Sequence, residues 1–108
     1  HSSIINGSTY LANTTYTQSV NTTRPILLHI QYVGNQGGNA AISVSFQWGL
    51  GSLTNTHTAI NGVGVNYVVE PTPAIVTLLE PNGSNTIYWR VNTTNLSLMS
   101  LRVSLMQI

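Results

Sequence analysis

Residues 42–48 read Ile42-Ser43-Val44-Ser45-Phe46-Gln47-Trp48, and this stretch decides the fold class. Large apolar side chains occupy every second position, and small or amide side chains occupy the positions between them. Successive side chains of a β-strand point to opposite faces of its sheet. The alternation therefore predicts a strand with one face in a core and the other face in water.

Outward from this strand, the chain keeps a period of two and shows no apolar stripe of helical spacing. Further strands are expected at residues 26–32, 63–69, 74–79, 85–92 and 98–107. Segments 34–39 and 49–62 are rich in glycine and asparagine and are expected to be loops, the second with a short strand near 56–60. Many short strands separated by turn residues predict a single all-β domain over residues 1–108, an antiparallel β-sandwich.

The composition is unusually poor in charge. Of 108 residues, three are Arg or Lys and two are Asp or Glu, which gives a formal net charge of +1. This balance does not fit nucleic-acid binding, which needs clustered basic side chains. No apolar run is long enough to span a bilayer as a helix, so no membrane insertion is expected. Low net charge also removes self-repulsion, which favours self-association.

Two phrases in the chain resemble the C-terminal knob of tailed-bacteriophage tail fibre and tail needle proteins. In the first, Tyr16-Thr17, Asn21-Thr22-Thr23 and Arg24-Pro25-Ile26 match the phrase that opens the knob in that family. In the second, residues 79–84 followed by Ile87-Tyr88-Trp89 match its Pro-Asn-Gly-Ser turn and the aromatic strand after it. The resemblance implies a jelly-roll or TNF-like knob, homotrimeric, at the C-terminal end of a longer polypeptide.

The same resemblance implies an extracellular virion appendage that attaches to a bacterial surface receptor, either a glycan or an outer-surface protein. A carbohydrate-binding or structural β-sandwich module of a secreted or cell-surface protein is the alternative interpretation. Oligomeric state separates the two, because a module is expected to be a monomer. His1-Ser2-Ser3 is typical of a cleaved-tag remnant and is kept out of the functional interpretation.

Two of the expected strands are apolar on both faces, which is unusual for a sheet with one face in water. One explanation is a central strand covered by a loop, and the other, which we favour, is burial against neighbouring subunits. An apolar C-terminus would otherwise tend to fray. The expected subunit-interface residues are Val76, Leu78, Leu98, Arg102, Met106 and Ile108.

Catalytic residues are scarce in this sequence. Glu70 and Glu80 are the only carboxylates, and each stands beside a proline at a turn, which does not suit a glycosidase pair. A Ser-His-Asp triad lacks its aspartate. The chain has no cysteine, and His29 and His57 are too few to form a zinc site within one copy. We therefore expect no catalysis, no metal and no cofactor.

Receptor binding is expected from neutral polar and aromatic side chains outside the core. Amides and hydroxyls suit sugar hydroxyl groups, and loops on a rigid β-scaffold commonly carry binding sites. A single polar or aromatic residue of this kind is more often an ordinary surface residue than a binding residue. The candidates are Asn35, Gln36 and Asn39 in the first loop, Asn55, His57 and Asn61 in the second, and Tyr88 and Arg90 on a strand face. The aromatic residues Phe46, Trp48 and Trp89 are expected in the core.

Overall fold

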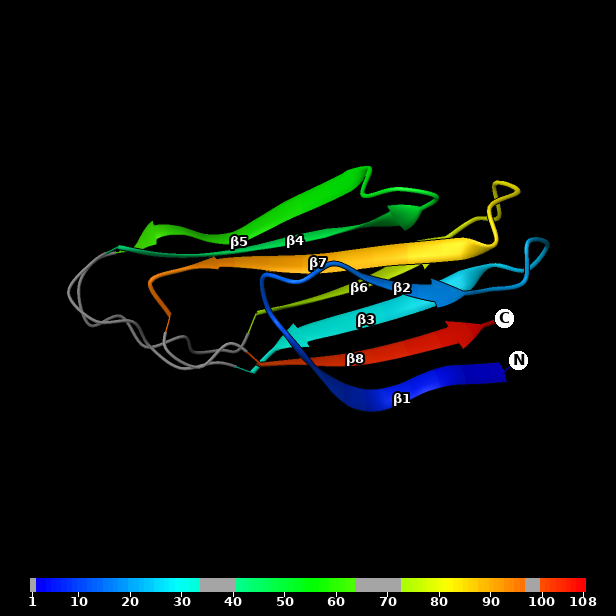
Figure 1. The fold of residues 1–108 in the computed structure, drawn as a ribbon, viewed down its shortest axis with the longest axis horizontal. Helices are drawn as coiled ribbons and strands as arrows, with labels where there is room; N and C mark the ends of the chain where they lie inside the picture. Colours follow the sequence, from blue (N-terminus) through cyan, green and yellow to red (C-terminus); the bar gives the residue numbers. More distant parts are fainter. Residues whose placement is uncertain (1, 34–40, 64–72, 97–99) are drawn as a thin grey trace.

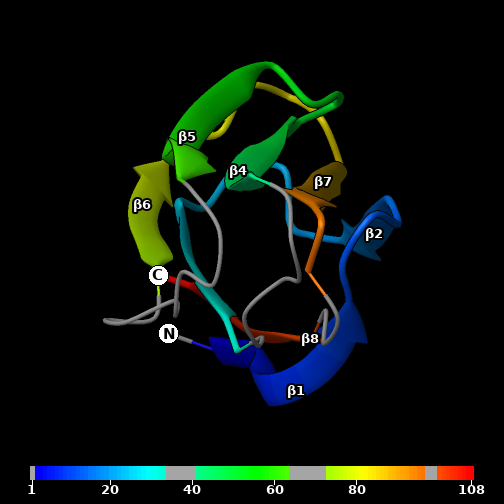
Figure 2. The same cartoon turned by 90° about the vertical axis from the view of Figure 1, so that its left-hand side faces the viewer.

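The protein is an antiparallel β-sandwich, as the sequence predicts. The computed structural model describes residues 2–33, 41–63, 73–96 and 100–108. Sheet A has the strand order β1-β8-β3-β6 and sheet B the order β2-β7-β4-β5. The strands are β1 (Ser2–Leu11), β2 (Tyr16–Ser19), β3 (Ile26–Tyr32), β4 (Ile42–Leu50), β5 (Asn55–Val63), β6 (Ala74–Leu79), β7 (Thr86–Thr94) and β8 (Ser100–Gln107). Figure 1 shows them running along the long axis, and Figure 2 shows the two sheets facing each other around a common interior.

The core lies between the two sheets and is built from the alternating faces that the sequence pattern indicates. On β3, the side chains of Ile26, Leu28, Ile30 and Tyr32 are at most 1% exposed. The core residues beside them on β8 and opposite them on β4 and β7 are also buried: Val44, Phe46, Ile87, Trp89, Val91, Leu101, Val103 and Leu105. Burial of one such aliphatic side chain contributes roughly 1.5–3 kcal/mol, so this interior is the main source of stability.

A buried amide holds the end of β8 to the loop between β2 and β3. The Asn21 N–H donates to Gln107 Oε1 over 2.7 Å, and Gln107 Nε2 donates to the Asn21 carbonyl over 2.9 Å. Arg24 Nε donates to the Ile108 carbonyl over 2.9 Å, and the Ile108 N–H donates to the Pro25 carbonyl over 3.0 Å. Bonds within the chain therefore hold the C-terminus, and its burial against a neighbouring subunit stays a prediction.

The prediction of a long loop over residues 49–62 is wrong in extent, although the short strand expected near 56–60 lies within β5. Strand β4 continues to Leu50, and β5 is a nine-residue strand paired with β4. The turn between them is tight, since a Cβ on Gly49 would lie 2.2 Å from the Ser52 carbonyl oxygen. Alternation fails in β5 because this edge strand is exposed on both faces along most of its length and its pairing with β4 is interrupted by register shifts.

Two further strands, β1 and β2, were not predicted from the sequence. Both lie at sheet edges and lack the apolar alternation of a half-buried strand: β2 is mostly Thr, Gln and Ser, and the apolar residues of β1 come in the adjacent pairs Ile4-Ile5 and Tyr10-Leu11. Ser2 and Ser3 pair with Gln107 and Met106, so they are part of sheet A. The expected strand at residues 63–69 and the expected loop at 34–39 lie outside the described residues, apart from Val63, which ends β5.

We predict that Gln107→Ala lowers the free energy of unfolding by about 1–3 kcal/mol, because it removes the acceptor of the Asn21 N–H and the donor to two carbonyls. Urea denaturation measures this loss. Gln18→Ala is the matched control, since the Gln18 amide donates only locally, to the Ser19 carbonyl, and its loss costs less than about 0.5 kcal/mol. Equal losses in the two variants would contradict a locking role for Gln107.

Candidate functional site

A groove of about 480 Å³ opens where the edge of sheet A meets the edge of sheet B. Strands β5 and β6 border it, and they belong to different sheets and do not pair with each other. The residues that line the groove are Trp48, Thr56, His57, Ala74, Ile75, Val76 and Thr77. We define these residues as the β5–β6 groove.

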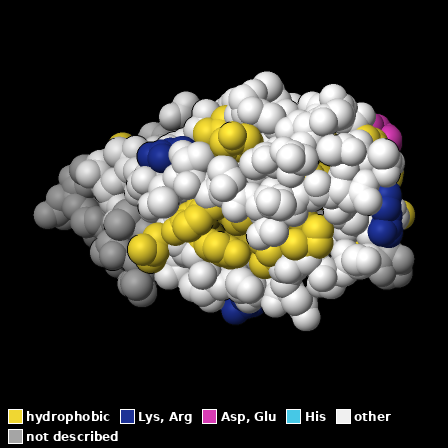
Figure 3. Space-filling view, turned by 45° about the vertical axis from the view of Figure 1, so that its right-hand side comes forward, with side chains coloured by type: hydrophobic (Ala, Val, Ile, Leu, Met, Phe, Trp, Pro, Cys, Tyr) yellow, Lys and Arg dark blue, Asp and Glu magenta, His cyan; other side chains and the backbone are white. Residues whose placement is uncertain are grey.

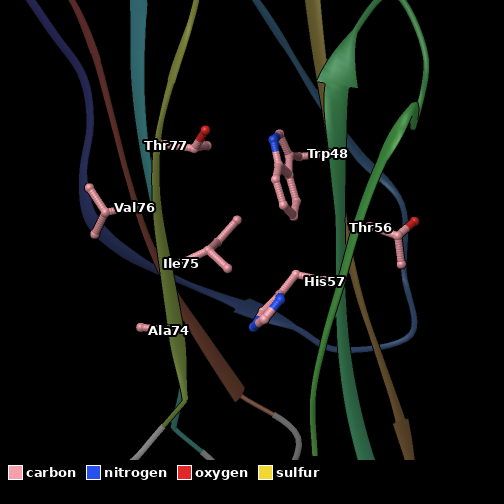
Figure 4. Close-up of a pocket in the computed structure, with 7 residues that line it drawn as sticks. All are labelled: Trp48, Thr56, His57, Ala74, Ile75, Val76 and Thr77. Atoms are coloured by element: carbon pink, nitrogen blue, oxygen red, sulfur yellow. The ribbon is translucent and has the colours of Figure 1, made fainter.

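Side chains from three strands point into the groove. In Figure 4, Trp48 from β4, His57 from β5 and Ile75 from β6 extend into the space between the two sheets, whereas Thr56 and Val76 point away from it. The register explains this arrangement, because His57 pairs with the buried Phe46 and directly paired residues lie on the same face of a sheet. The backbone of rigid strands therefore sets the positions of the indole and the imidazole.

The other open side of the sandwich is closed by aromatic packing. The rings of Tyr10 and Tyr16 lie 4.7 Å apart between centroids, and that of Tyr16 stacks 5.9 Å from that of Trp89. The Leu11 N–H donates to the Tyr16 hydroxyl over 3.1 Å, which ties β1 to β2. Because this cluster fills the seam between β1 and β2, the two seams of the sandwich differ, and the β5–β6 groove is the open one.

The chemistry of the groove is neutral. The described residues of its lining offer an indole, an imidazole, two threonine hydroxyls and aliphatic surface, and none of them carries a carboxylate or a guanidinium. Among the described residues, no group of three or more His, Cys, Asp or Glu side chains is placed to hold a metal ion. The same part of the chain contains no helix of the length and hydropathy needed to cross a membrane. The lining is suited to an uncharged ligand rather than to acid–base chemistry with paired carboxylates.

The predicted receptor-binding residues that the structure describes do not form one cluster. Asn55, His57 and Asn61 lie on strand β5 rather than on a loop, and of these only His57 lines the groove. The Asn55 amide donates to the Trp48 carbonyl over 3.2 Å and so supports the end of β4. Asn61 pairs with Ser43 beside a register shift. Asn35, Gln36 and Asn39 lie outside the described residues.

Tyr88 and Arg90 lie on the outer face of β7, away from the groove. Strand β4 stands between β7 and β5 in sheet B. Arg90 Nη1 donates to the Thr15 hydroxyl over 3.2 Å, and its Nε donates to the Asn92 amide oxygen. The Arg90 side chain therefore ties neighbouring parts of the outer surface together.

Sequence reasoning missed Trp48, Ile75 and Thr77 as groove residues. Trp48 was expected in the core, but it is only half-buried, whereas Phe46 and Trp89 are buried as expected. The alternation that assigns Trp48 to the inner face is correct. The alternation does not reveal that β5, which pairs with β4 at Trp48, is the edge strand of sheet B. For this reason the indole of Trp48 reaches the open seam.

The predicted interface residues lie largely on the outer face of sheet A. Val76 is 67% exposed and Leu78 is 51% exposed. Leu78 pairs with Leu27, and Leu27 pairs with the half-buried Met106, so an apolar row crosses three neighbouring strands. We name Leu27, Val76, Leu78 and Met106 the sheet-A patch; Leu27 was not among the expected interface residues.

The other expected interface residues lie around or beyond this patch. Arg102 is exposed on the same outer face, opposite Gln31 and Thr9, further along β8. Ile108 is 50% exposed and follows the end of β8. Leu98 lies outside the described residues.

The free edge of β6 carries unpaired backbone groups. The Tyr32 N–H donates to the Pro73 carbonyl over 2.9 Å. Because residues of an antiparallel strand alternate in the direction of their backbone groups, those of Ala74, Val76 and Leu78 point away from β3, to the open side. This edge has neither a charged side chain nor a register shift in its pairing with β3, which are common protections against edge pairing.

Comparisons with known proteins concern the fold. No family model matches the chain, and no curated protein matches it in sequence. Among solved structures, it is similar to the infectious bursal disease virus VP2 subviral particle, with a TM-score of 0.43 and 10% sequence identity. The match covers 95% of this chain and 30% of that chain. The class that the strands and their register define is an all-β, two-sheet antiparallel sandwich domain.

We predict that the two tryptophans differ in their access to solvent. Trp48 is half-buried in the groove, whereas Trp89 is 1% exposed, so iodide is expected to quench mainly Trp48 fluorescence. Trp48→Phe is expected to remove most of the quenchable emission and to leave a blue-shifted signal from Trp89. Equal quenching of the parent and Trp48→Phe would show that the groove is closed in solution.

Proposed function

We propose that this chain is a non-catalytic attachment domain that works as a homotrimer, a knob at the tip of a tailed-phage appendage that binds a bacterial surface receptor. The observation that carries the proposal is the exposed sheet-A patch. The resemblance of its sequence phrases to fibre and needle knobs supports the placement on a virion. The neutral groove supports binding rather than catalysis.

The sheet-A patch is suited to contact with further copies of the chain. Its central row, Leu78–Leu27–Met106, is apolar across three strands, and Val76 stands beside it on β6. Apolar clusters of this kind on a sheet face commonly mark interaction sites. Covering one side chain such as Leu78 is worth at most about 1.5–3 kcal/mol, so several must be buried together to offset the cost of association.

The surface charge of the domain supports self-association. A formal net charge of +1 gives little repulsion between copies. On the face in Figure 3, apolar side chains gather in a band and the basic side chains stand isolated around it. The polar part of such a surface consists mainly of uncharged Asn, Thr and Ser side chains. Identical chains can therefore approach each other closely without strong charge repulsion.

A monomeric carbohydrate-binding or structural module of a secreted or cell-surface protein is the second candidate. The observation that favours it is the C-terminal lock, in which Gln107, Arg24 and Ile108 are bonded within the chain. This strand end is ordered without a neighbour, so one argument for subunit burial is removed. The exposed sheet-A patch still favours the trimer.

We predict a trimer, with a mass in sedimentation equilibrium about three times the 11.6 kDa of one chain. Leu78→Asp and Met106→Asp each place a charge in the sheet-A patch, and burial of an unpaired charge is costly. Both variants are expected to sediment as folded monomers. They are also expected to label bacterial cells more weakly than the parent, because the avidity of three copies is lost.

Leu11→Asp is the matched control for these variants. Leu11 is 62% exposed and lies opposite Ser100, at the far end of the outer face of sheet A from the patch. This variant is expected to assemble like the parent. A parent protein that is monomeric at micromolar concentration would contradict the trimer and favour the module.

We predict that association does not weaken when sodium chloride is raised from about 0.1 to 1 M, where the Debye length falls to about 3 Å. The patch contains no charged residue, and apolar burial does not depend on Coulomb attraction. Sedimentation velocity at both salt concentrations measures the species present. Dissociation at high salt would show that ion pairs, and not the sheet-A patch, hold the copies together.

A further inference from the structure

We propose that the β5–β6 groove is the receptor site of this domain and that its ligand is a neutral saccharide. The inference rests on the proposed attachment function and adds the location of the site and the chemical class of the ligand. It is carried by the arrangement of Trp48, His57, Ile75 and Thr77 in the groove.

The groove has the size and support of a small-molecule site. Its volume of about 480 Å³ lies within the range of about 300–1,000 Å³ typical of ligand pockets. Trp48, His57 and Ile75 stand on three different strands and point into the same space (Figure 4). Because paired strands hold their backbone, the site is largely formed before a ligand arrives, which lowers the entropy cost of binding.

The side chains in the groove match the two kinds of surface on a sugar ring. One face of a pyranose carries C–H groups, which pack against an indole or an aliphatic side chain, here Trp48 and Ile75. Its edge carries hydroxyl groups, which need both donors and acceptors. The imidazole of His57 and the hydroxyl of Thr77 supply these, since neutral imidazole has one of each and a hydroxyl can serve as both.

The uncharged character of the described lining selects among ligand classes. None of the described residues that line the groove is an Arg or Lys that could pair with a uronic acid or a phosphate, and none is a carboxylate that could pair with an amine. A charged ligand would lose hydration without gaining a partner, which is unfavourable. A neutral saccharide avoids that cost.

The groove and the sheet-A patch adjoin each other at Val76, which lines the groove by its position and points its side chain to the patch. Val76 and Thr77 are neighbours on β6, so their side chains lie on opposite faces, Val76 on the patch and Thr77 toward the groove. When a second copy packs on the sheet-A patch, the groove therefore lies at the margin of the contact between the two copies. A trimer would present the groove three times, and weak contacts with a repeating surface polysaccharide would add through avidity.

The test is a glycan array probed with the intact parent protein, followed by calorimetric titration of the saccharides that it retains. The array carries neutral hexoses, 6-deoxyhexoses and N-acetylhexosamines, as single sugars and short oligomers, beside matched uronic acids. We expect saturable binding of neutral saccharides that is unchanged by added salt and that shifts Trp48 fluorescence. His57→Ala and Trp48→Leu are expected to weaken binding by about tenfold or more.

Thr58→Ala is the control, because Thr58 adjoins His57 on β5 but is not among the residues that line the groove, and its side chain lies on the opposite face of the strand, beside Ser45; its binding should equal that of the parent. His57 is exposed, so its replacement is expected to leave the fold intact even if Trp48→Leu does not fold. No retained neutral saccharide, tighter salt-dependent binding of uronic acids, or full binding by His57→Ala would each overturn the proposal.

Sedimentation of the same samples separates the claim of a groove site from the claim of a trimer. A trimer without saccharide binding refutes the groove site alone, and a monomer that binds saccharide refutes the trimer alone.

Discussion

The inward face of β3 is the constraint on which the rest of the structure depends. Its alternate residues from Ile26 to Tyr32 are buried, and the strand pairs with β8 on one side and β6 on the other. Since the side-chain period of a strand is two, burial of one face of β3 determines which residues of both neighbours point outward. Leu78 and Met106 lie on the outer face of sheet A because they pair with the outward-facing Leu27, and Thr77 faces the groove because it pairs with the buried Leu28.

The proposed binding surfaces lie on β6, where the pairing of sheet A ends. Strand β6 closes one sheet and β5 closes the other, and each leaves a free backbone edge beside the other. One seam of the sandwich is filled by Tyr10, Tyr16 and Trp89, and the seam at β5 and β6 is open, with Trp48 and His57 inside it. The sheet-A patch, the free edge of β6 and the groove therefore meet on one strand of six residues.

Scarcity of charge gives these surfaces a common character. With five charged side chains in 108 residues, neither the patch nor the groove includes an ion pair. Recognition by such a surface depends on shape, apolar contact and neutral hydrogen bonds. The Arg residues instead serve the fold: Arg24 donates to the carbonyls of Gln107 and Ile108, and Arg90 joins β7 to Thr15.

The sequence by itself determined the fold class, most of the core and the outward position of Val76 and Leu78, because alternation along one strand is a local property. It indicated only a short strand near 56–60 within β5, and it did not reveal the C-terminal lock through Gln107 or the groove around Trp48. Strand β5 is exposed on both faces along most of its length and has no apolar period to detect, and Gln107 meets Asn21 across 86 positions of sequence. Which strands become edges is decided by long-range pairing, so only the tertiary structure could show that His57 and Thr77 face the same open seam.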